Sequence, residues 1–519
     1  MIRRWSWIIY SSNQIVYRLT GYDLKEKGLG PIAKGGIYNF IGLLVTSITA
    51  FLFQFILGKN LSPGEVGIFN LGLTISSIIG LVILVGLDRG VVRFIAHYRG
   101  INNQERTLGA VESSFRMLLV TTVVLTPIIW IMADDISQYI FNKPELAPVL
   151  RILILTLPLV TFTRWSVSVF LGYKRVKPMV FIEQILVPVS RILFVLIIIY
   201  FFSKSIVAIS QSYLIASIPG FLLAGITLWI YIRSQNQNVR AIPIYYELFA
   251  FSWPLMFSGL LNRTNTYTET LILGGLSTSD QVGIYTISLK ISIILTMFFE
   301  AINGIWAPYI ADLISRMEFY KLSQQFKNAT YWAFSLTLPF ALIMFLESPL
   351  IMAIFGREYM QGAQILRILA ISQVIYVLGG MSALILIMAG YSRLNLIDLI
   401  LTFLLSLLLD FLLIPFWGAS GAAIASAATV IFITLLRSGQ VYLKMHIHPY
   451  HKDYYKPLVA GLISFLVVIL IKPLFTGMIG FVELILIGLL LFGIYSLLMI
   501  MFLKTGSPWS NKTSGDIRS

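Results

Sequence analysis

The sequence is 519 residues long, and 57% of these residues are hydrophobic while only 12% are charged. Soluble domains carry about 25% charged residues, so this composition is typical of a chain that lies largely in lipid. The absence of cysteine excludes a disulfide framework, thiolate metal sites and thiol nucleophiles.

The chain opens with residues 1–34, in which basic residues alternate with aromatic and aliphatic ones. This segment lacks both the long apolar core and the small-residue cleavage site of a signal peptide, so we expect it to be retained. Its composition fits either a cytoplasmic tail or an amphipathic helix on the membrane surface.

Apolar stretches then follow one another from residue 35 to residue 503, and each is close to the roughly 20 residues that cross a bilayer. We therefore expect an all-α integral membrane protein with about fourteen transmembrane helices. The predicted spans are 35–57, 68–87, 109–133, 146–170, 179–202, 205–231, 248–274, 284–305, 330–348, 364–389, 394–415, 421–443, 454–475 and 480–503. Gly220, Gly379 and Gly380 lie inside long spans and predict kinks or unwound turns. Residues 504–519 form a short polar tail.

Lysine and arginine are distributed unevenly over the connecting segments. With the N-terminus in the cytoplasm, the inward segments hold 26 of these residues and the outward loops hold five. The positive-inside rule predicts this bias for a multi-pass protein of the plasma or inner membrane whose two termini are both cytoplasmic. We interpret the net charge of +15 as a signal of topology. Because the cations are scattered over many loops, we predict no nucleic-acid partner.

The two halves of the chain share a pattern at an offset of 216 residues. Val66-Gly67-Ile68-Phe69 matches Val282-Gly283-Ile284-Tyr285, and six predicted helices separate the two copies. An even number of helices preserves orientation, so this is a parallel repeat about an axis along the membrane normal. We expect an N lobe at 35–231, a C lobe at 248–443 and two added helices at 454–503. Two lobes around a midplane site are the architecture of an alternating-access carrier.

Four further patterns follow one another along the chain. They are Gly86-Leu87-Asp88-Arg89, Gly283-Ile284-Tyr285, Phe355-Gly356-Arg357-Glu358-Tyr359, and Leu409-Asp410-Phe411-Leu412-Leu413-Ile414-Pro415 leading to Gly418-Ala419-Ser420-Gly421. In this order they resemble the polysaccharide flippase branch of the multidrug/oligosaccharidyl-lipid/polysaccharide exporter superfamily. The resemblance implies a multidrug-exporter-like fold that passes a lipid-diphosphate-linked oligosaccharide to the outer leaflet through a cavity between two lobes. Two departures are Asp410, where the family usually has Asn, and a first span without the cation that relatives often carry.

Seven cations fall within the predicted spans when Arg437, Lys456 and Lys472, towards the ends of their spans, are counted with the loops. A lipid-facing cation at a helix centre costs about 2.5–3.5 kcal/mol. Arg116 has Glu112 one turn away, so we expect a local ion pair. Arg151 and Arg367 lie close to the ends of their spans, where long side chains can reach the interface. These three cations need no cavity.

The other four cations have no acid within four residues along the chain; they are Arg164, Arg191, Arg263 and Lys290. The strongest candidate is Arg263, because Asn262, Arg263 and Asn265 belong to a polar tract that is costly unless it lines a cavity. Arginine binds a diphosphate bidentately and lysine binds it as a point charge. We predict that the four cations and the two asparagines bind substrate. The alternative is that the cations pair across helices with the seven acids of the spans.

Two intramembrane acids, Glu269 and Glu300, are the candidates for proton or sodium coupling. Three histidines, His446, His448 and His451, lie in one inward loop beside lysines, so we interpret them as loop residues. The sequence predicts no metal site and no cofactor.

Three functions compete. The first is flipping of a lipid-linked oligosaccharide, with membrane lipids around the protein and a polysaccharide polymerase or glycosyltransferases as further candidate partners. The second is cation-coupled export of drugs or small molecules by the same fold, which would favour an acidic cavity. The third is a membrane polymerase or glycosyltransferase, which generally needs a sizeable loop or domain with carboxylates. No loop between spans exceeds roughly twenty residues, so we predict a transporter that is not an enzyme.

Overall fold

The computed structural model describes residues 30–235, 239–475 and 480–505, and these residues fold into helices without a β-strand. The expectations for residues 1–29 and 506–519 lie outside the described residues. The helices are α2 (Gly30–Asn60), α3 (Pro63–Leu84), α4 (Leu87–Gly100), α5 (Gln104–Ile131), α6 (Ala133–Asp135), α7 (Leu146–Gly172), α8 (Val187–Phe201), α9 (Ile206–Gln235), α10 (Tyr245–Leu276), α11 (Ser279–Ile293), α12 (Met297–Ser315), α13 (Phe319–Leu346), α14 (Ser348–Ala353), α15 (Ala363–Leu378), α16 (Ser382–Met388), α17 (Ser392–Met445), α18 (Tyr455–Ile471) and α19 (Gly480–Thr505).

Twelve helical segments of the described residues are long and apolar enough to cross a membrane. One of them, α17, is 54 residues long and has non-helical backbone at Gly418, so it makes two crossings. Helix α10 is not among the twelve because the polar tract around Arg263 lowers its hydropathy. Its 32 residues nevertheless extend about 48 Å. With α17 counted twice and α10 added, the predicted count of fourteen is recovered.

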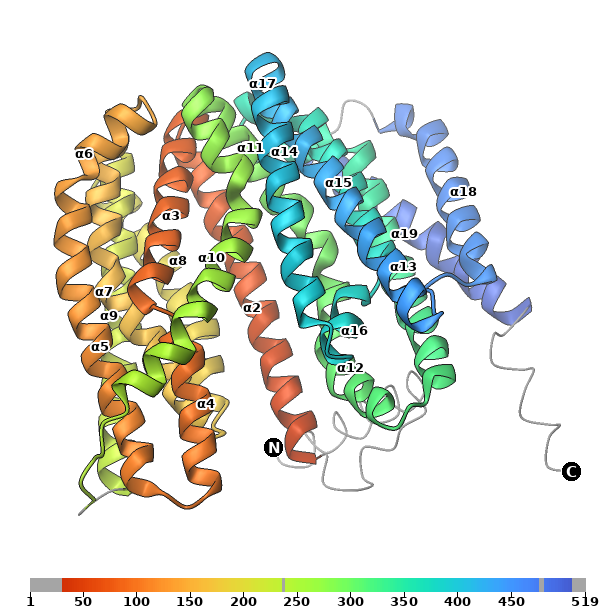
Figure 1. Cartoon of the computed structure of the whole chain (residues 1–519). Coiled ribbons are helices and arrows are strands. Elements are labelled where there is room, and N and C mark those ends of the chain that lie inside the picture. The colour runs from red at the N-terminus through yellow and green to blue at the C-terminus, as the bar shows by residue number, and fades with distance from the viewer. Residues whose placement is uncertain (1–29, 236–238, 476–479, 506–519) are drawn as a thin grey trace, which may run out of the picture.

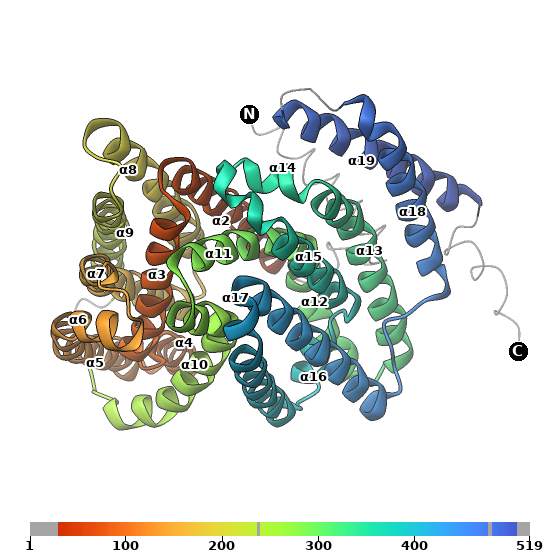
Figure 2. The same cartoon turned by 90° about the horizontal axis from the view of Figure 1, so that it is seen from above.

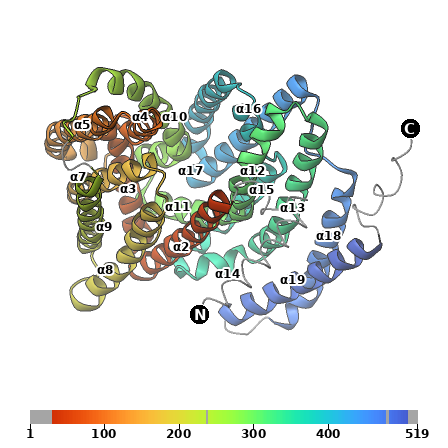
Figure 3. The ribbon, with the colours of Figure 1, turned by 90° about the horizontal axis from the view of Figure 1, so that it is seen from below.

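The helices form two groups. Helices α2–α9 lie on one side and α11–α17 on the other, with α18 and α19 at the outer edge of the second group (Figure 1 and Figure 2). We call these two groups the N lobe and the C lobe, and we count α10 with the C lobe because its most extensive packing is against α17. Helix α11 lies near the centre of the molecule in the views from both ends (Figure 2 and Figure 3), and it packs against α3 of the N lobe.

The two ends of the bundle are distinguished by their connections. We call the end with connections 60–63, 141–146 and 276–279 the cation-poor face, because the sequence predicts these loops to be outward. The opposite end, with connections 100–104 and 173–178, is the cation-rich face.

Helices α3 and α11 begin at equivalent positions of the repeat, although only α3 has a side-chain cap. Ser62 precedes α3, where its hydroxyl accepts from the Glu65 N–H while the Glu65 carboxylate accepts from the Ser62 N–H, which is a capping box. Thr278 precedes α11 in the same extended conformation, 216 residues later. The sequence repeat therefore includes the helix start as well as the apolar pattern that follows it.

Of the three glycines predicted to kink or unwind long spans, Gly379 and Gly380 lie at a break between two helices, whereas Gly220 lies within a continuous helix. Helix α15 ends at Leu378 and α16 begins at Ser382, with Gly380 in the left-handed region at φ 60°. The predicted unwound turn is confirmed there. Helix α9 runs without interruption past Gly220, where the missing side chain makes room for Val187 of α8.

Helix α10 contacts both lobes. Near its start, Ser252 packs so closely on α4 that a Cβ at Gly90 would lie 2.1 Å from the Ser252 hydroxyl oxygen. Further along, Asn265 Nδ2 donates to the Leu399 carbonyl of α17 at 3.0 Å. In Figure 1 the helix accordingly runs obliquely from the N lobe towards the centre of the bundle.

Candidate functional site

The lobes meet at the cation-poor face through the repeated glycines. A Cβ at Gly67 would lie 2.0 Å from the carbonyl oxygen of Ser279, and a Cβ at Gly283 would lie 1.9 Å from the carbonyl oxygen of Pro63. Pro63 and Ser279 are themselves 216 residues apart, so the two contacts are equivalent by the repeat. Small residues permit this close approach of two membrane helices. The glycines therefore allow α3 and α11 to close this face.

A polar group lies deeper along the same pair of helices. Asn70 of α3 donates to the Thr286 hydroxyl at 3.1 Å and accepts from Lys290 Nζ at 2.6 Å. Asn70 and Thr286 are another pair at the repeat offset. Among the described residues, no acid lies within ion-pair distance of Lys290. Lys290 therefore brings an unneutralised cation to the boundary between the lobes.

Arg263 is exposed, on the part of α10 that follows its contact with α4. Its guanidinium lies 4.9 Å from the ring centroid of Tyr267, one turn further along the helix. Asn262 is also exposed, and the described residues include no ion-pair partner for Arg263. Asn265 instead turns towards α17 through its bond to Leu399. The structure thus leaves Arg263 and Asn262 exposed and uses Asn265 to join two helices.

The two N-lobe cations face acids and aromatic rings. Arg164 lies 3.2 Å from the carboxylate of Asp88, an acid outside the predicted spans, so Arg164 is paired, although not with any of the seven span acids. Arg191 lies 4.3 Å from the ring centroid of Tyr213, and its Nε is buried without a hydrogen bond. Glu183 interacts electrostatically with both arginines. These four charges balance one another within the N lobe.

The C lobe contains two acids that lie together. Glu269 of α10 is 4% exposed and Asp410 of α17 is fully buried, and their charges interact. The Ser406 hydroxyl donates to Asp410 at 3.3 Å, while the other Asp410 oxygen is buried without a hydrogen bond. Ser426 lies within hydrogen-bonding reach of Glu269. Helices α10 and α17 thus bury two interacting carboxyl groups, each with a serine hydroxyl beside it.

Comparison with known families shows which family the chain belongs to. The family described as "Polysaccharide biosynthesis protein" matches residues 32–314, which is more than half of the chain. The chain belongs to this polysaccharide biosynthesis family. The family described as "MatE" matches residues 254–412. The resemblance to flippases of the multidrug/oligosaccharidyl-lipid/polysaccharide exporter superfamily is confirmed.

Individual relatives share little sequence identity with this chain, although the matches cover most of its length. The capsular polysaccharide biosynthesis protein CapF of Staphylococcus aureus is 25% identical over 75% of this chain and 93% of its own. The lipid II flippase MurJ of Bacillus subtilis is 21% identical over 75% of this chain and 78% of its own.

Solved structures of other proteins confirm the fold of this chain. A lipid II flippase MurJ in an inward closed conformation superposes with a TM-score of 0.72 at 14% identity, over 90% of this chain and 99% of that one. A multidrug resistance transporter of the MATE family, in an inward-facing conformation, superposes with a TM-score of 0.67 at 14% identity, over 78% of this chain and 98% of that one. The multidrug-exporter-like fold is thereby established.

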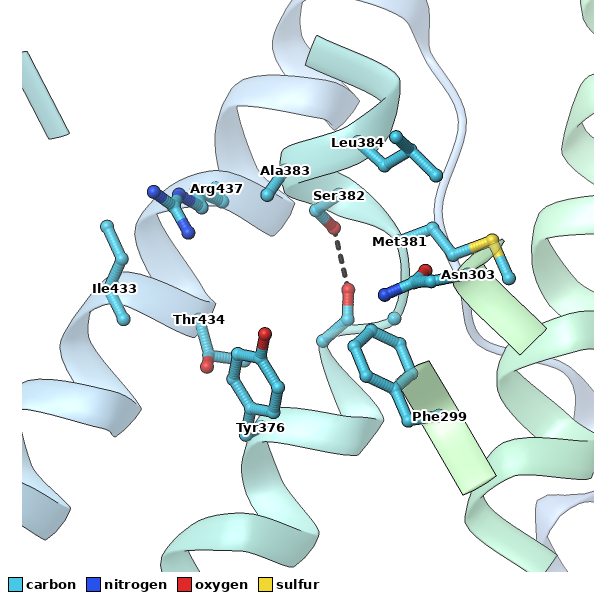
Figure 4. Close-up of a pocket in the computed structure, with 12 residues that line it drawn as sticks. Phe299, Asn303, Tyr376, Met381, Ser382, Ala383, Leu384, Ile433, Thr434 and Arg437 are labelled. Carbon is cyan, nitrogen blue, oxygen red and sulfur yellow. Dashed lines mark hydrogen bonds between the residues drawn. The ribbon is translucent and has the colours of Figure 1, made fainter. Parts of the chain in front are cut away.

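Glu300, the second predicted coupling acid of this family member, lies beside a separate polar pocket of the C lobe. Asn303 and Tyr376 line the pocket with Arg437, and Glu300 interacts with the first two. Figure 4 shows Arg437 of α17 at the edge of this pocket. Arg437 already faces the buried Asp398 at 3.6 Å and donates to Asn395 at 3.1 Å. The structure does not bring Glu300 together with Glu269.

The remaining intramembrane cations behave as expected. Arg116 pairs with Glu112 one turn away. Arg151 pairs with Asp134, and Arg367 donates to the Phe345 carbonyl at the end of α13 at 3.1 Å.

Sequence reasoning did not assign three residues that the structure places at the site. Asp410 was considered only as an ion-pair partner, although its spacing of four residues from Ser406 puts both on one helix face. Asn70 carried no signal, because a single asparagine in an apolar span has no partner until α3 meets α11. Asp88 was placed in a loop, so its pairing with Arg164 was not foreseen.

Proposed function

We propose that the protein flips a lipid-diphosphate-linked oligosaccharide, a polysaccharide precursor, from the cytoplasmic to the outer leaflet by alternating access. In this proposal the cation-rich face and both termini are cytoplasmic, and the membrane is the plasma or inner membrane. The sugar and diphosphate pass between the lobes while the lipid tail stays in the bilayer. The protein works without catalytic chemistry of its own.

Arg263 is the observation that carries the proposal. An exposed arginine in a membrane helix, without an acid partner among the described residues, is costly unless water or an anionic ligand solvates it. A diphosphate supplies such an anion, and guanidinium binds it with paired hydrogen bonds. Lys290 adds a second cation at the lobe boundary. Asn262 is placed to bind sugar hydroxyls or phosphate oxygens.

Coupling is assigned to Glu269, together with Asp410. Two buried carboxyls that lie close together favour the binding of a proton or a sodium ion, because like charges in low dielectric repel. Helix α10 carries both Glu269 and Arg263, so ion binding and cargo binding act on one helix. Glu300 is retained as a second, weaker candidate.

The alternative is a cation-coupled exporter of drugs or other small molecules. It is supported by the fold likeness to the MATE family transporter and by the acid pair of the C lobe. The exposed Arg263 argues against cationic drugs, because a cavity for cations would carry uncompensated acids instead.

A membrane polymerase or a glycosyltransferase remains a candidate partner of this protein.

The test is a deletion strain of the source organism. We expect loss of surface polysaccharide and accumulation of its lipid-linked precursor, measured by lipid extraction and mass spectrometry. Arg263→Ala should restore transport at most to about a tenth of the normal level, since a charge-assisted hydrogen bond contributes about 1.5–3 kcal/mol. Arg263→Lys should restore more, because it keeps the charge.

Arg116→Ala is the matched control, because Arg116 is an exposed intramembrane arginine that already has an acid partner. It should complement the deletion fully. Normal precursor levels in the deletion strain would contradict the flippase function. Full activity of Arg263→Ala would contradict only the assignment of the binding residue.

A further inference from the structure

Lys143 connects the two lobes at the cation-poor face. It lies in the N-lobe loop before α7, and its Nζ donates to the carbonyl oxygens of Gly274 and Ser277, each at 2.7 Å. Gly274 belongs to the last turn of α10, and Ser277 is the residue that caps this helix. Lys143 is therefore an N-lobe cation bound to the carboxyl end of a helix that carries Arg263 and Glu269.

The interaction has a clear electrostatic basis. The last carbonyl groups of a helix lack hydrogen-bond donors from within the helix and carry the negative end of its dipole, which a lysine stabilises. Burial lowers the pKa of Lys143 from its ordinary value, and the neighbouring Glu145 opposes this shift. The ammonium group is thus partly removed from water, and its attraction to the carbonyl groups is stronger there than at an exposed position.

Further bonds extend this contact into the C lobe. The Ser277 hydroxyl donates to the Gln281 side-chain carbonyl of α11 at 2.7 Å. The same oxygen accepts from the backbone N–H of Ala419, at the bend of α17, at 2.9 Å. Lys143 is consequently joined to the ends of three C-lobe helices through short hydrogen bonds.

The contact differs from the glycine contact beside it. Gly67 and Gly283 allow close packing but add no directional bond, whereas Lys143 holds one lobe to the other with two charge-assisted hydrogen bonds. Opening of the cation-poor face requires the loop at 141–146 to move away from the end of α10. The Lys143 bonds must break in that step, and water must replace them.

We propose that Lys143 is the latch of the cation-poor face: it holds the N lobe to the end of α10 while this face is closed and releases it each time the face opens. Lys143 is a positioning residue, since it acts through α10 and touches no cargo. The inference rests on the proposed alternating access and adds the contact that controls one of its two gates.

The absence of cysteine in the chain allows a direct test, because one introduced cysteine is then the only thiol. Thr286→Cys is a suitable reporter, since Thr286 is 4% exposed at the lobe boundary below the glycine contact. The rate at which a membrane-impermeant maleimide modifies this thiol in intact cells reports opening of the face. Lys204→Cys, on an exposed loop of the same face, establishes that the reagent reaches this side.

In this background Lys143→Ala should raise the modification rate about tenfold, the effect expected from loss of a charge-assisted hydrogen bond. Lys204→Ala, which removes an exposed lysine from the same face, should leave the rate unchanged. Lys143→Arg should return the rate towards normal. An unchanged rate in Lys143→Ala would overturn the latch, and so would an equal increase in Lys204→Ala.

A second measurement covers the case in which Lys143→Ala fails to fold. A short, reducible bifunctional thiol reagent applied to Glu145→Cys/Ser277→Cys, two positions that line one pocket and leave Lys143 in place, should stop transport, and reductant should restore it. Transport that continues in the cross-linked protein would contradict the latch. The labelling experiment requires no cargo. If the proposed cargo is wrong, the deletion strain will show normal precursor levels, and the labelling result for Lys143 will be unaffected.

Discussion

In the N lobe the intramembrane acids interact with arginines, whereas in the C lobe Glu269 and Asp410 interact with each other. Asp88 is 3.2 Å from Arg164, and Glu183 interacts with Arg164 and Arg191. No ion pair involves Glu269 or Asp410 among the residues that the structure describes, and one Asp410 oxygen is buried without any hydrogen bond.

We propose that this difference separates a structural use of charge in the N lobe from a functional use in the C lobe. Paired charges cost desolvation but leave a lobe electrically neutral, so they are compatible with a rigid frame. Two buried carboxyls without a cation are unfavourable until a proton or a metal ion binds. A site that is unfavourable when empty can respond to an ion gradient, which a neutral cluster cannot do. We therefore expect the C lobe to respond to the coupling ion.

The largest effect is expected from Glu269→Gln. The amide keeps the shape but cannot bind a proton or a sodium ion, so precursor transport should fall at least about tenfold, which corresponds to a coupling free energy near 1.4 kcal/mol. The thermal unfolding temperature in detergent should not fall, because a buried acid without a cation has been removed. Asp410→Asn should behave likewise. Normal transport by both variants would contradict a coupling role for these two acids of the C lobe.

A smaller effect is expected at the contact between the lobes. Gly283→Ala would place a methyl group 1.9 Å from the Pro63 carbonyl oxygen, so α3 and α11 must separate. Overpacking of this kind costs about 1–3 kcal/mol, which should appear as a lower unfolding temperature and faster modification of the Thr286→Cys reporter. The control is Gly439→Ala, because a Cβ at Gly439 meets nothing within 4 Å. Equal stability of the two variants would contradict the close contact.

The smallest effect is expected from Asp88→Asn in the N lobe. Arg164 is 46% exposed, so solvent screening limits the stability of its pair with Asp88 to less than about 1 kcal/mol. Transport per folded molecule should remain close to normal, measured beside Glu269→Gln in the same cells. A loss of transport as large as that of Glu269→Gln would mean that the N lobe, too, takes part in coupling.

The prediction from sequence was most accurate where it relied on local and repeated features. Apolar runs identified the crossing segments, and the paired Val-Gly-Ile patterns identified the internal repeat. The unwound turn at Gly379 and Gly380 followed from glycine alone. Among the cations, Arg116, Arg151 and Arg367 were explained in advance, because their partners or interfaces lie close along the chain.

The fold places the predicted binding residues in different environments, and the sequence alone did not predict these differences. Arg263 and Asn262 are exposed, Asn265 joins α10 to α17, and Arg164 pairs with an acid 76 positions earlier. These outcomes depend on which faces of neighbouring helices meet, and an apolar helix that is hydrophobic on all sides contains little information about its packing face.

By itself the sequence determined that this chain is a multi-pass helical membrane protein with an internal repeat, because the bilayer requires long apolar helices whatever their packing. Only the tertiary structure decided that Glu269 interacts with Asp410 and that Lys143 binds the end of α10. Each of these contacts joins segments more than 100 residues apart, and hydrogen bonds and charge interactions act over a few ångströms. The chain must fold before such residues can interact.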